Sequence, residues 1–155
     1  MQNVVNLNIS TADYLSEEFQ VVAFKLGQEE YGADVLNVQE INRPLNITRV
    51  PRTQEYIEGV VNLRGNIVPV INLHTKFNIK GQGSEDDKRI IVFQFDDLKV
   101  GIIVDEVSEV IRLKTSDIEE TAKVYNAMTV EHIKGIAKVN SRLLILLDLP
   151  KILEV

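Results

Sequence analysis

Two histidines, His74 and His132, are the side chains of this chain best suited to bind a metal ion or to transfer a proton near neutral pH. A metal site needs several ligands that converge, usually at a helical or hairpin spacing. Neither histidine has a partner ligand at such a spacing. We therefore expect both histidines to be structural, and we expect no metal site.

Adjacent carboxylates occur at Asp86-Asp87, Asp96-Asp97 and Glu119-Glu120. Each pair falls in a predicted loop, turn or helix start, where carboxylates normally stay solvated. General acid–base catalysis instead needs a carboxyl group whose pKa is shifted in a desolvated cleft. The chain also has no glycine-rich nucleotide-binding motif and no G-x-S-x-G motif. These observations predict a protein that is not an enzyme and that has no cofactor.

The composition of the 155 residues is ordinary for a soluble globular protein, with 45% apolar and 26% charged residues. The net charge of −6 and the scarcity of aromatic residues disfavour nucleic acid as a partner. The absence of cysteine excludes disulfides and thiolate metal sites. The N-terminus lacks the features of a signal peptide, and no apolar run reaches the ~18 residues of a membrane span. We expect a cytoplasmic protein with no direct membrane insertion.

The chain contains two versions of one pattern. A shift of 69 positions places Phe24 to Ile41 on Phe93 to Val110, with Gly32 on Gly101. A shift of 76 places the segment from Ile57 to Leu73 on the segment from Ile133 to Leu149. Two blocks in the same order indicate a duplicated unit, and the increase in the shift assigns a longer connection to the second unit.

Each unit reads as β-structure, with polar turns between short apolar runs and few short helices. We predict two pseudo-repeated, five-stranded, SH3-like β-barrels that pack together, each closed or nearly closed. The expected divisions are a flexible tail over 1–17, a first barrel over 18–80, a linker over 81–88 and a second barrel over 89–155. Strand exchange between the halves is left open. Pro69, inside an apolar run, predicts an edge or bulged strand.

The runs from Ile67 to Ile71 and from Leu143 to Leu147 do not alternate between apolar and polar residues. Strands of this kind usually lie between two apolar layers. We therefore expect each of these strands to contact a second layer in addition to the core of its own barrel.

The two units differ most at one hairpin, where Asn62-Leu63-Arg64-Gly65 in the first matches Lys138-Val139-Asn140-Ser141 in the second. Duplicated positions that diverge in chemistry are candidates for function. At a hairpin tip the Arg64 guanidinium can form a bidentate pair with a carboxylate, and Glu40 is the candidate. The alternative is that Arg64 is an ordinary surface residue.

Two segments of the first unit carry a resemblance to a known family: Glu30 to Ile41 (EYGADVLNVQEI) and Ile57 to Leu73 (IEGVVNLRGNIVPVINL). The second is similar to the CheW signature I-x-G-V-x-N-L-R-G-x-I-x-P-V-[ID]-[DN]-L, with Asn72 where Asp is common. Val100 to Val110 resembles the second-half strand of the family. The likeness extends over residues ~18 to 154.

The resemblance implies a non-catalytic scaffold that couples chemoreceptors to the histidine kinase CheA in bacterial chemotaxis. The implied partners are the regulatory domain of a CheA-type kinase, which has the same fold, and the cytoplasmic tip of methyl-accepting chemoreceptors. The protein is expected to be a monomer when free and to be recruited to membrane-bound receptor arrays. Two alternatives stay open: the same fold as part of a larger signalling protein, and an unrelated barrel that binds nucleic acid or peptide.

The family positions linked with partner binding or coupling fall on Val38, Glu40, Gly59, Arg64, Val107 and Val110. Val38 and Ile41 in one unit match Val107 and Val110 in the other, so we expect them to line an apolar groove for a receptor helix. The alternative is that all four are core residues. Gly59 could instead serve a close backbone approach. We predict that Arg64 pairs with Glu40 at the rim of this groove.

Overall fold

The computed structural model describes residues 17–44, 46–119 and 130–153. The predicted flexible tail over 1–17 therefore lies outside the described residues, except for Glu17. Most of the longer connection in the second unit, over residues 120–129, is also outside them.

Strands make up most of the described chain. They are β1 (Glu18–Leu26), β2 (Glu29–Asp34), β3 (Val38–Asn42), β4 (Ile57–Leu63), β5 (Asn66–Asn72), β6 (Arg89–Phe95), β7 (Leu98–Val104), β8 (Glu106–Lys114), β9 (Ile118–Glu119), β10 (Ile133–Val139) and β11 (Arg142–Leu147). The helices are short: α2 (Leu73–Phe77), α3 (Leu149–Ile152) and the 3₁₀ turns η1 (Val35–Asn37), η2 (Glu85–Asp87), η3 (Thr115–Asp117) and η4 (Val130–His132). The prediction of a mainly β protein with few short helices is confirmed.

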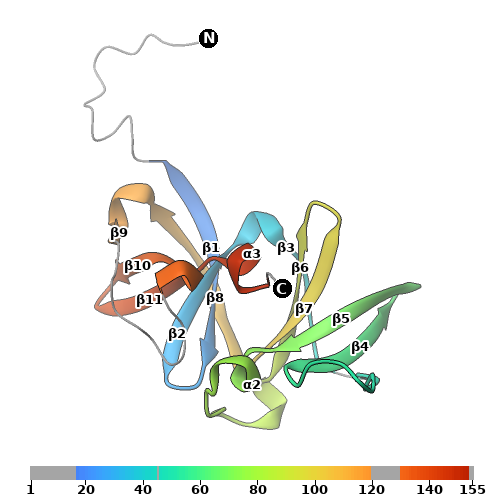
Figure 1. The fold of residues 1–155 in the computed structure, drawn as a ribbon. Helices are drawn as coiled ribbons and strands as arrows, with labels where there is room; N and C mark the ends of the chain where they lie inside the picture. The colour runs from blue at the N-terminus through green and yellow to red at the C-terminus, as the bar shows by residue number, and fades with distance from the viewer. Residues whose placement is uncertain (1–16, 45, 120–129, 154–155) are drawn as a thin grey trace, which may run out of the picture.

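The strands form two sheets that lie side by side (Figure 1). Sheet A has the order β8-β1-β2-β11-β10-β9, and sheet B has the order β3-β6-β7-β5-β4. Of the two forms predicted for the five-stranded barrels, closed or nearly closed, the closed form is not found, because both sheets have open edges. Sheet A also has a sixth strand, the two-residue β9.

Neither sheet is built from one half of the sequence. Sheet A combines β1 and β2 of the first unit with β8 to β11 of the second, and sheet B combines β6 and β7 of the second with β3 to β5 of the first. The chain therefore changes sheet between β2 and β3 and again between β7 and β8. The loop over 81–88 separates the two sequence units but not the two sheets.

The sequence repeat is reproduced in the strand register. In sheet A, Gly32 pairs with Leu146 on the parallel neighbour β11, and in sheet B Gly101 pairs with Val70 on the parallel neighbour β5. These four positions are related by the shifts of 69 and 76. The β4–β5 and β10–β11 hairpins also change register at equivalent places, next to Gly59 and Gly135. The duplication is therefore visible in the hydrogen-bonded pairing as well as in the sequence.

Three clusters of buried side chains form the core. The largest, here called the shared core, contains residues of both sheets and of both α-helices: Val22, Phe24, Leu26, Tyr31, Ala33, Ile71, Leu73, Phe77, Ile79, Ile91, Phe93, Val100, Ile102, Val104, Ile133, Ile136, Ile145, Leu147, Leu149 and Ile152. The other two clusters each lie on one sheet only. In β11, Leu144 and Leu146 belong to the cluster of sheet A, whereas Ile145 and Leu147 belong to the shared core. The expected contact of this non-alternating strand with two apolar layers is confirmed.

Pro69 does not lie on an edge strand, because β5 has β7 on one side and β4 on the other. The parallel pairing with β7 begins only at Val70, so the missing amide hydrogen of Pro69 lies outside that ladder. Toward β4, Pro69 is opposite Val60, close to the change of register beside Gly59. The proline is thus accommodated in an internal strand, at a position that forms no pairing with β7.

A buried carboxylate holds the second change of sheet in place. Asp105 is 2% exposed and lies between β7 and β8. Its Oδ2 accepts hydrogen bonds from the amides of Gly27 (2.7 Å) and Gln82 (3.1 Å), and its Oδ1 is 2.8 Å from Nε2 of His74. The group connects the β1–β2 turn of sheet A, the loop between the units and α2. His74 is therefore structural, as the sequence predicts.

Replacing Asp105 by Ala should lower the free energy of unfolding by about 3 kcal/mol, because it leaves two amides and an imidazole without their buried acceptor. Urea denaturation would measure the loss. Asp97→Ala, in the exposed β6–β7 turn, is the control and should change stability by less than about 0.5 kcal/mol. Equal effects of the two substitutions would contradict the role given to Asp105.

Candidate partner-binding site

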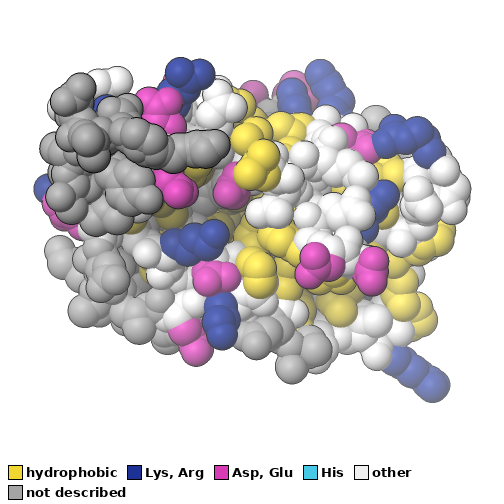
Figure 2. Space-filling view, turned by 90° about the horizontal axis from the view of Figure 1, so that it is seen from above, with side chains coloured by type: hydrophobic (Ala, Val, Ile, Leu, Met, Phe, Trp, Pro, Cys, Tyr) yellow, Lys and Arg dark blue, Asp and Glu magenta, His cyan; other side chains and the backbone are white. Residues whose placement is uncertain are grey.

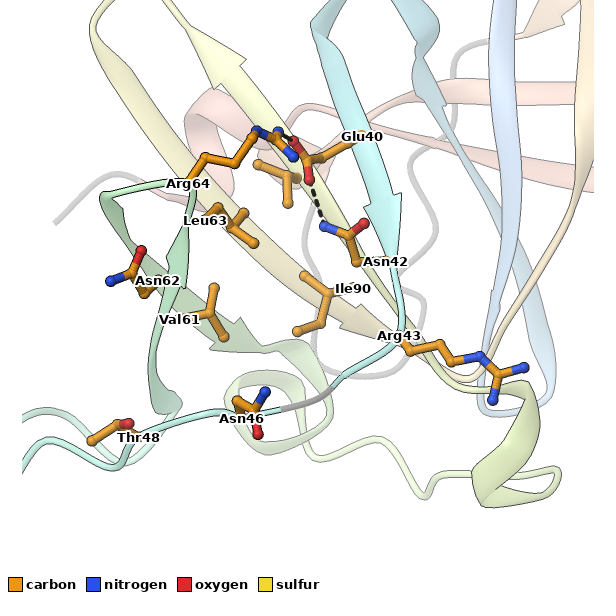
Figure 3. A pocket seen from close by; sticks show the side chains of 11 residues that line it. Glu40, Asn42, Arg43, Asn46, Thr48, Val61, Asn62, Leu63, Arg64 and Ile90 are labelled. Carbon is orange, nitrogen blue, oxygen red and sulfur yellow. Dashed lines mark hydrogen bonds and ion pairs between the residues drawn. The ribbon is translucent and has the colours of Figure 1, made fainter.

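Glu40 and Arg64 form an ion pair across the open side of sheet B (Figure 3). Glu40 lies on the edge strand β3, and Arg64 lies in the turn that follows the opposite edge strand β4. A contact between the two edges requires the sheet to curl, with this face on the inside. The predicted pairing of Arg64 with Glu40 is confirmed.

The turn between β4 and β5 presents the Arg64 side chain. Arg64 and Gly65 both have positive φ angles, of 52° and 88°, as a two-residue hairpin turn requires. The Oδ1 atom of Asn62 accepts a hydrogen bond of 2.9 Å from the Gly65 amide and so fixes the turn. The Arg64 side chain stays 75% exposed, whereas that of Glu40 is only 17% exposed. The guanidinium is therefore accessible to a partner as well as to Glu40.

The Glu40 carboxylate has two donors in its surroundings. Asn42 donates a hydrogen bond of 2.6 Å from Nδ2 to Oε1, and Arg64 donates to Oε2. The hydrogen bond from Asn42 is the largest influence that lowers the pKa of Glu40 below its usual value; Arg64 contributes to the lowering, and burial opposes it. Glu40 is thus an anion held in a fixed orientation at the edge of the sheet.

The ion pair borders a hollow of about 560 Å³ in the open side of sheet B. Val61, Ile90 and Val92 contribute apolar side chains to its lining, and Asn42, Asn46, Thr48 and Asn62 contribute polar ones. Figure 3 shows the labelled side chains of β3, the β4–β5 hairpin and Ile90 around this space. The hollow combines an apolar floor with a polar rim, which is the usual composition of a binding pocket.

The equivalent place in sheet A is filled. Asn42 pairs with Ile90 in sheet B, and at the positions related by a shift of 69, Ile111 pairs with Val21 in sheet A. Ile111 is 8% exposed and belongs to the apolar cluster of its sheet. A polar side chain in one sheet thus replaces a packed aliphatic one in the other, which accounts for part of the space in sheet B.

Gly59 is buried, and it lies where two backbones meet. Thr48 and Val60 exchange two hydrogen bonds of 2.8 Å, and a Cβ atom on Gly59 would overlap the Thr48 carbonyl group. Gly135 has the same relation to the Glu119 carbonyl oxygen, 2.8 Å from its hypothetical Cβ. Among the two uses foreseen for Gly59, this geometry gives a physical basis to the close backbone approach.

The four apolar residues expected to line a groove divide into two kinds. Val38 and Val107 are partly buried and pack against the shared core. Ile41 and Val110 are 40% and 52% exposed. The alternative that all four are core residues is therefore wrong for Ile41 and Val110. A single groove formed by all four stays a prediction, because β3 and β8 are edges of different sheets.

Further exposed apolar residues were not singled out from the sequence. Leu36, in η1 just before β3, is 86% exposed, and Ile67 and Leu143, related by the shift of 76, are 63% and 53% exposed. Figure 2, a view from above, shows hydrophobic side chains gathered on the middle of that face among acidic and basic ones. An isolated exposed leucine gives no sequence signal, but matching exposed positions in a repeat could be found by comparing its two copies.

Among the described residues, no group of three His, Asp or Glu side chains is arranged to hold a metal ion. Within the same part of the chain, no helix has the length and apolar character needed to cross a membrane.

Known proteins resemble this chain over most of its length. The family model described as a CheW-like domain matches residues 20–155. A chemotaxis protein CheW from Klebsiella aerogenes is 37% identical over 154 residues, which cover 99% of this chain and 92% of that protein. A second, from Helicobacter pylori, is 40% identical over 141 residues, covering 89% and 83%. The crystal structure of the scaffolding protein TtCheW from Thermoanaerobacter tengcongensis superposes with a TM-score of 0.82 at 38% identity, covering 90% of each chain.

A double-mutant cycle on Glu40→Gln and Arg64→Gln should give a coupling energy of about 0.5 kcal/mol at neutral pH, the size expected of an accessible ion pair. Because the pKa of Glu40 is lowered in the folded state, its contribution is complete above the unfolded-state pKa and is lost as the pH falls through the folded-state value. Urea titrations at several pH values would measure the coupling. A coupling that is zero at neutral pH, or that persists in acid, would contradict the pair's contribution.

Exchanging the polar and aliphatic residues of the two sheets tests the origin of the hollow. In a Glu40→Ala background, which removes the acceptor of the Asn42 hydrogen bond, Asn42→Ile should raise the free energy of unfolding by about 1 kcal/mol by covering apolar floor. Ile111→Asn, the reverse exchange in sheet A, should lower it by about 3 kcal/mol because it buries an amide among apolar side chains. Thermal and urea unfolding provide both values. If Asn42→Ile destabilised the Glu40→Ala protein, the space would not accept an aliphatic side chain.

Proposed function

This chain belongs to the CheW family, and from that premise we propose that it joins chemoreceptors to a CheA-type histidine kinase by binding the cytoplasmic tip of the receptors and the regulatory domain of the kinase. Its general role is that of a non-catalytic coupling adaptor in chemotaxis signal transduction. The observation that carries the assignment is the match of the family model to residues 20–155, nearly the whole chain.

The exposed edge strands support a receptor helix as one partner. Ile41 on β3 and Val110 on β8 are exposed apolar side chains at equivalent positions of the repeat, and Leu36 lies close to β3 in sequence. An amphipathic helix binds by laying its apolar face on such residues while its polar face stays in water. Exposed apolar residues at matching places favour recognition over chance exposure.

The β4–β5 and β10–β11 hairpins, here called the sheet ends, support a second partner of related fold. Ile67 and Leu143 are exposed at the same position of the β4–β5 and β10–β11 hairpins. A kinase regulatory domain with the same architecture would present hairpins of matching shape. The adaptor would then contact the kinase at a sheet end and the receptor along an edge strand, so that both bind at once.

The proposed site residues act in different ways. Glu40 and Arg64 offer charge and directed hydrogen bonds, and Val110 offers exposed apolar surface. Val38 and Val107 act by setting the position of the edge strands against the shared core. Gly59 acts through the close contact with Thr48 that shapes the outer edge of sheet B.

We further propose that the protein is a monomer when free and that it works in the cytoplasm, where it is recruited to receptor arrays. The location follows from the coupling role, since an adaptor must reach the cytoplasmic end of its receptors.

Isothermal titration against an isolated kinase regulatory domain and against a receptor-tip fragment tests the assignment. We expect binding at micromolar dissociation constants or tighter, and a roughly tenfold weakening for the receptor fragment when Ile41 or Val110 is changed to Ala. Arg64→Gln should weaken binding and reduce its dependence on salt.

Leu98→Ala is the matched control, because Leu98 is also an exposed apolar residue, at 46%, but lies at the start of β7, an internal strand of sheet B. Folded wild-type protein that bound neither partner would refute the proposed coupling. Equal weakening by Leu98→Ala and Val110→Ala would refute the assignment of the edge strands.

A further inference from the structure

Arg142, the first residue of β11, contacts two carboxylates with its whole guanidinium fork. Its Nε and Nη2 atoms donate to Oε1 and Oε2 of Glu30 at 3.0 and 2.7 Å, and its Nη1 donates to Oε2 of Glu109 at 3.0 Å. The bond pair to Glu30 is bidentate, the geometry that makes arginine–carboxylate contacts strong and directional.

The three side chains come from three strands of sheet A. Glu30 is on β2, the neighbour of β11, whereas Glu109 is on β8, the edge strand beyond β1. Because β1 and β2 lie between β8 and β11 in the sheet order, the contact of Arg142 with Glu109 requires sheet A to curl, and it holds the edge strand. The same edge strand carries Val107 and Val110, two of the residues assigned to partner binding above.

This cluster is the counterpart of the Glu40–Arg64 pair in sheet B. Glu109 corresponds to Glu40 by the shift of 69, but the residue that corresponds to Arg64 is Asn140. The cation is instead supplied two positions later, at Arg142. The two sheets thus close their open sides with the same type of contact but with different residues.

The surrounding charges are reversed between the two sheets. Glu30 corresponds to Lys99 in sheet B, and Lys99 adds to the cationic surroundings of Glu40. Sheet A therefore has one arginine between two carboxylates, and sheet B has one carboxylate near two cations. Within each cluster, opposite charges are paired. The two clusters have opposite compositions of charge, so the residues of one could not replace those of the other.

Burial makes the sheet A cluster more than a loose surface pair. The Glu30 and Arg142 side chains are 15% and 35% exposed. Partial burial alone would raise the pKa of Glu30, but hydrogen bonds from Arg142 and Ser108 outweigh it and lower the pKa. Hydrogen bonds to Glu30 and Glu109 in turn raise the pKa of Arg142. The same hydrogen bonds therefore fix the orientation of the Glu30 and Arg142 side chains and keep both of them charged.

We propose that Arg142 is a positioning residue for partner binding: by bridging Glu30 and Glu109 it holds the β8 edge, and hence Val107 and Val110, in the binding conformation. Arg142 does not contact the partner itself, and its functional consequence depends on the coupling role proposed above. Arg64 has the corresponding positioning role for β3, with Val38 and Ile41, and its exposed guanidinium is in addition accessible to the partner.

The test uses the full chain with Arg142→Gln, which removes the charge, and Arg142→Lys, which keeps it without the fork. Arg64→Gln is the counterpart variant, and Lys134→Gln, which removes an exposed cation on β10 of the same sheet, is the control. Ile152→Val destabilises the shared core without touching either cluster and controls for a general loss of stability. Each variant is examined by methyl NMR, amide hydrogen exchange and titration with the receptor-tip and kinase domains.

Arg142→Gln should shift the methyl resonances of Val107 and Val110, leave those of Val38 and Ile41 in place, and speed exchange in β8 about tenfold. Arg64→Gln should give the opposite pattern. Binding of the partner that uses β8 should weaken about tenfold with Arg142→Gln and less with Arg142→Lys, and should be unchanged with Lys134→Gln and Ile152→Val.

The proposal is overturned if folded Arg142→Gln protein keeps wild-type resonances and exchange in β8, or if these change while binding of both partners does not. It is also overturned if Ile152→Val reproduces the same shifts, since the effect would then be general destabilisation. Wild-type protein that binds neither partner would refute the coupling role instead, and the NMR and exchange data would still decide whether Arg142 holds β8.

Discussion

The exchange of strand pairs between the two halves of the chain is the constraint on which the rest of the structure depends. Each sheet needs a hairpin from the other half, so the chain must pass from sheet A to sheet B and back. The second passage is fixed by Asp105, whose buried carboxylate binds the turn at Gly27, the loop at Gln82 and the ring of His74. Because both sheets contribute to one shared core, they form a single cooperative body.

The two sheets are similar in backbone and different in side chains, and function can be assigned to the differences. Pairing registers and bulges repeat, so each edge strand is presented in the same way. What changes is the filling of the open side, with Asn42 in one sheet and Ile111 in the other, and the sign of the charges around it. A duplicated scaffold can thus offer two surfaces that distinguish two partners without a second fold.

The sequence predicts the β class and the repeat, because strand periodicity and hairpin signals are local. It predicts the Glu40–Arg64 pair, which joins opposite edges of sheet B, from the chemistry of an arginine at a hairpin tip. It also indicates the two-layer burial of β11, since Leu143 to Leu147 lacks alternation. The sequence does not predict that β1 pairs with β8. Both halves carry equivalent hairpins, so pairing within one half and pairing between the halves fit the same apolar pattern. The cluster at Arg142 was missed for a related reason: its cation is displaced by two positions from Arg64, so aligning the units hides it.

Strand exchange also bears on how the chain folds as it is synthesised. When β5 has left the ribosome, β1 and β2 are present, but their neighbours β8 and β11 are not yet made, and β3 lacks β6. The N-terminal half therefore cannot complete either sheet and presents unpaired strand edges until most of the C-terminal half has emerged. Pairings of such large sequence separation make folding slow and expose the nascent chain to aggregation. The strand exchange that joins the two sheets in the folded adaptor therefore also requires nearly the whole chain to be synthesised before folding can be completed.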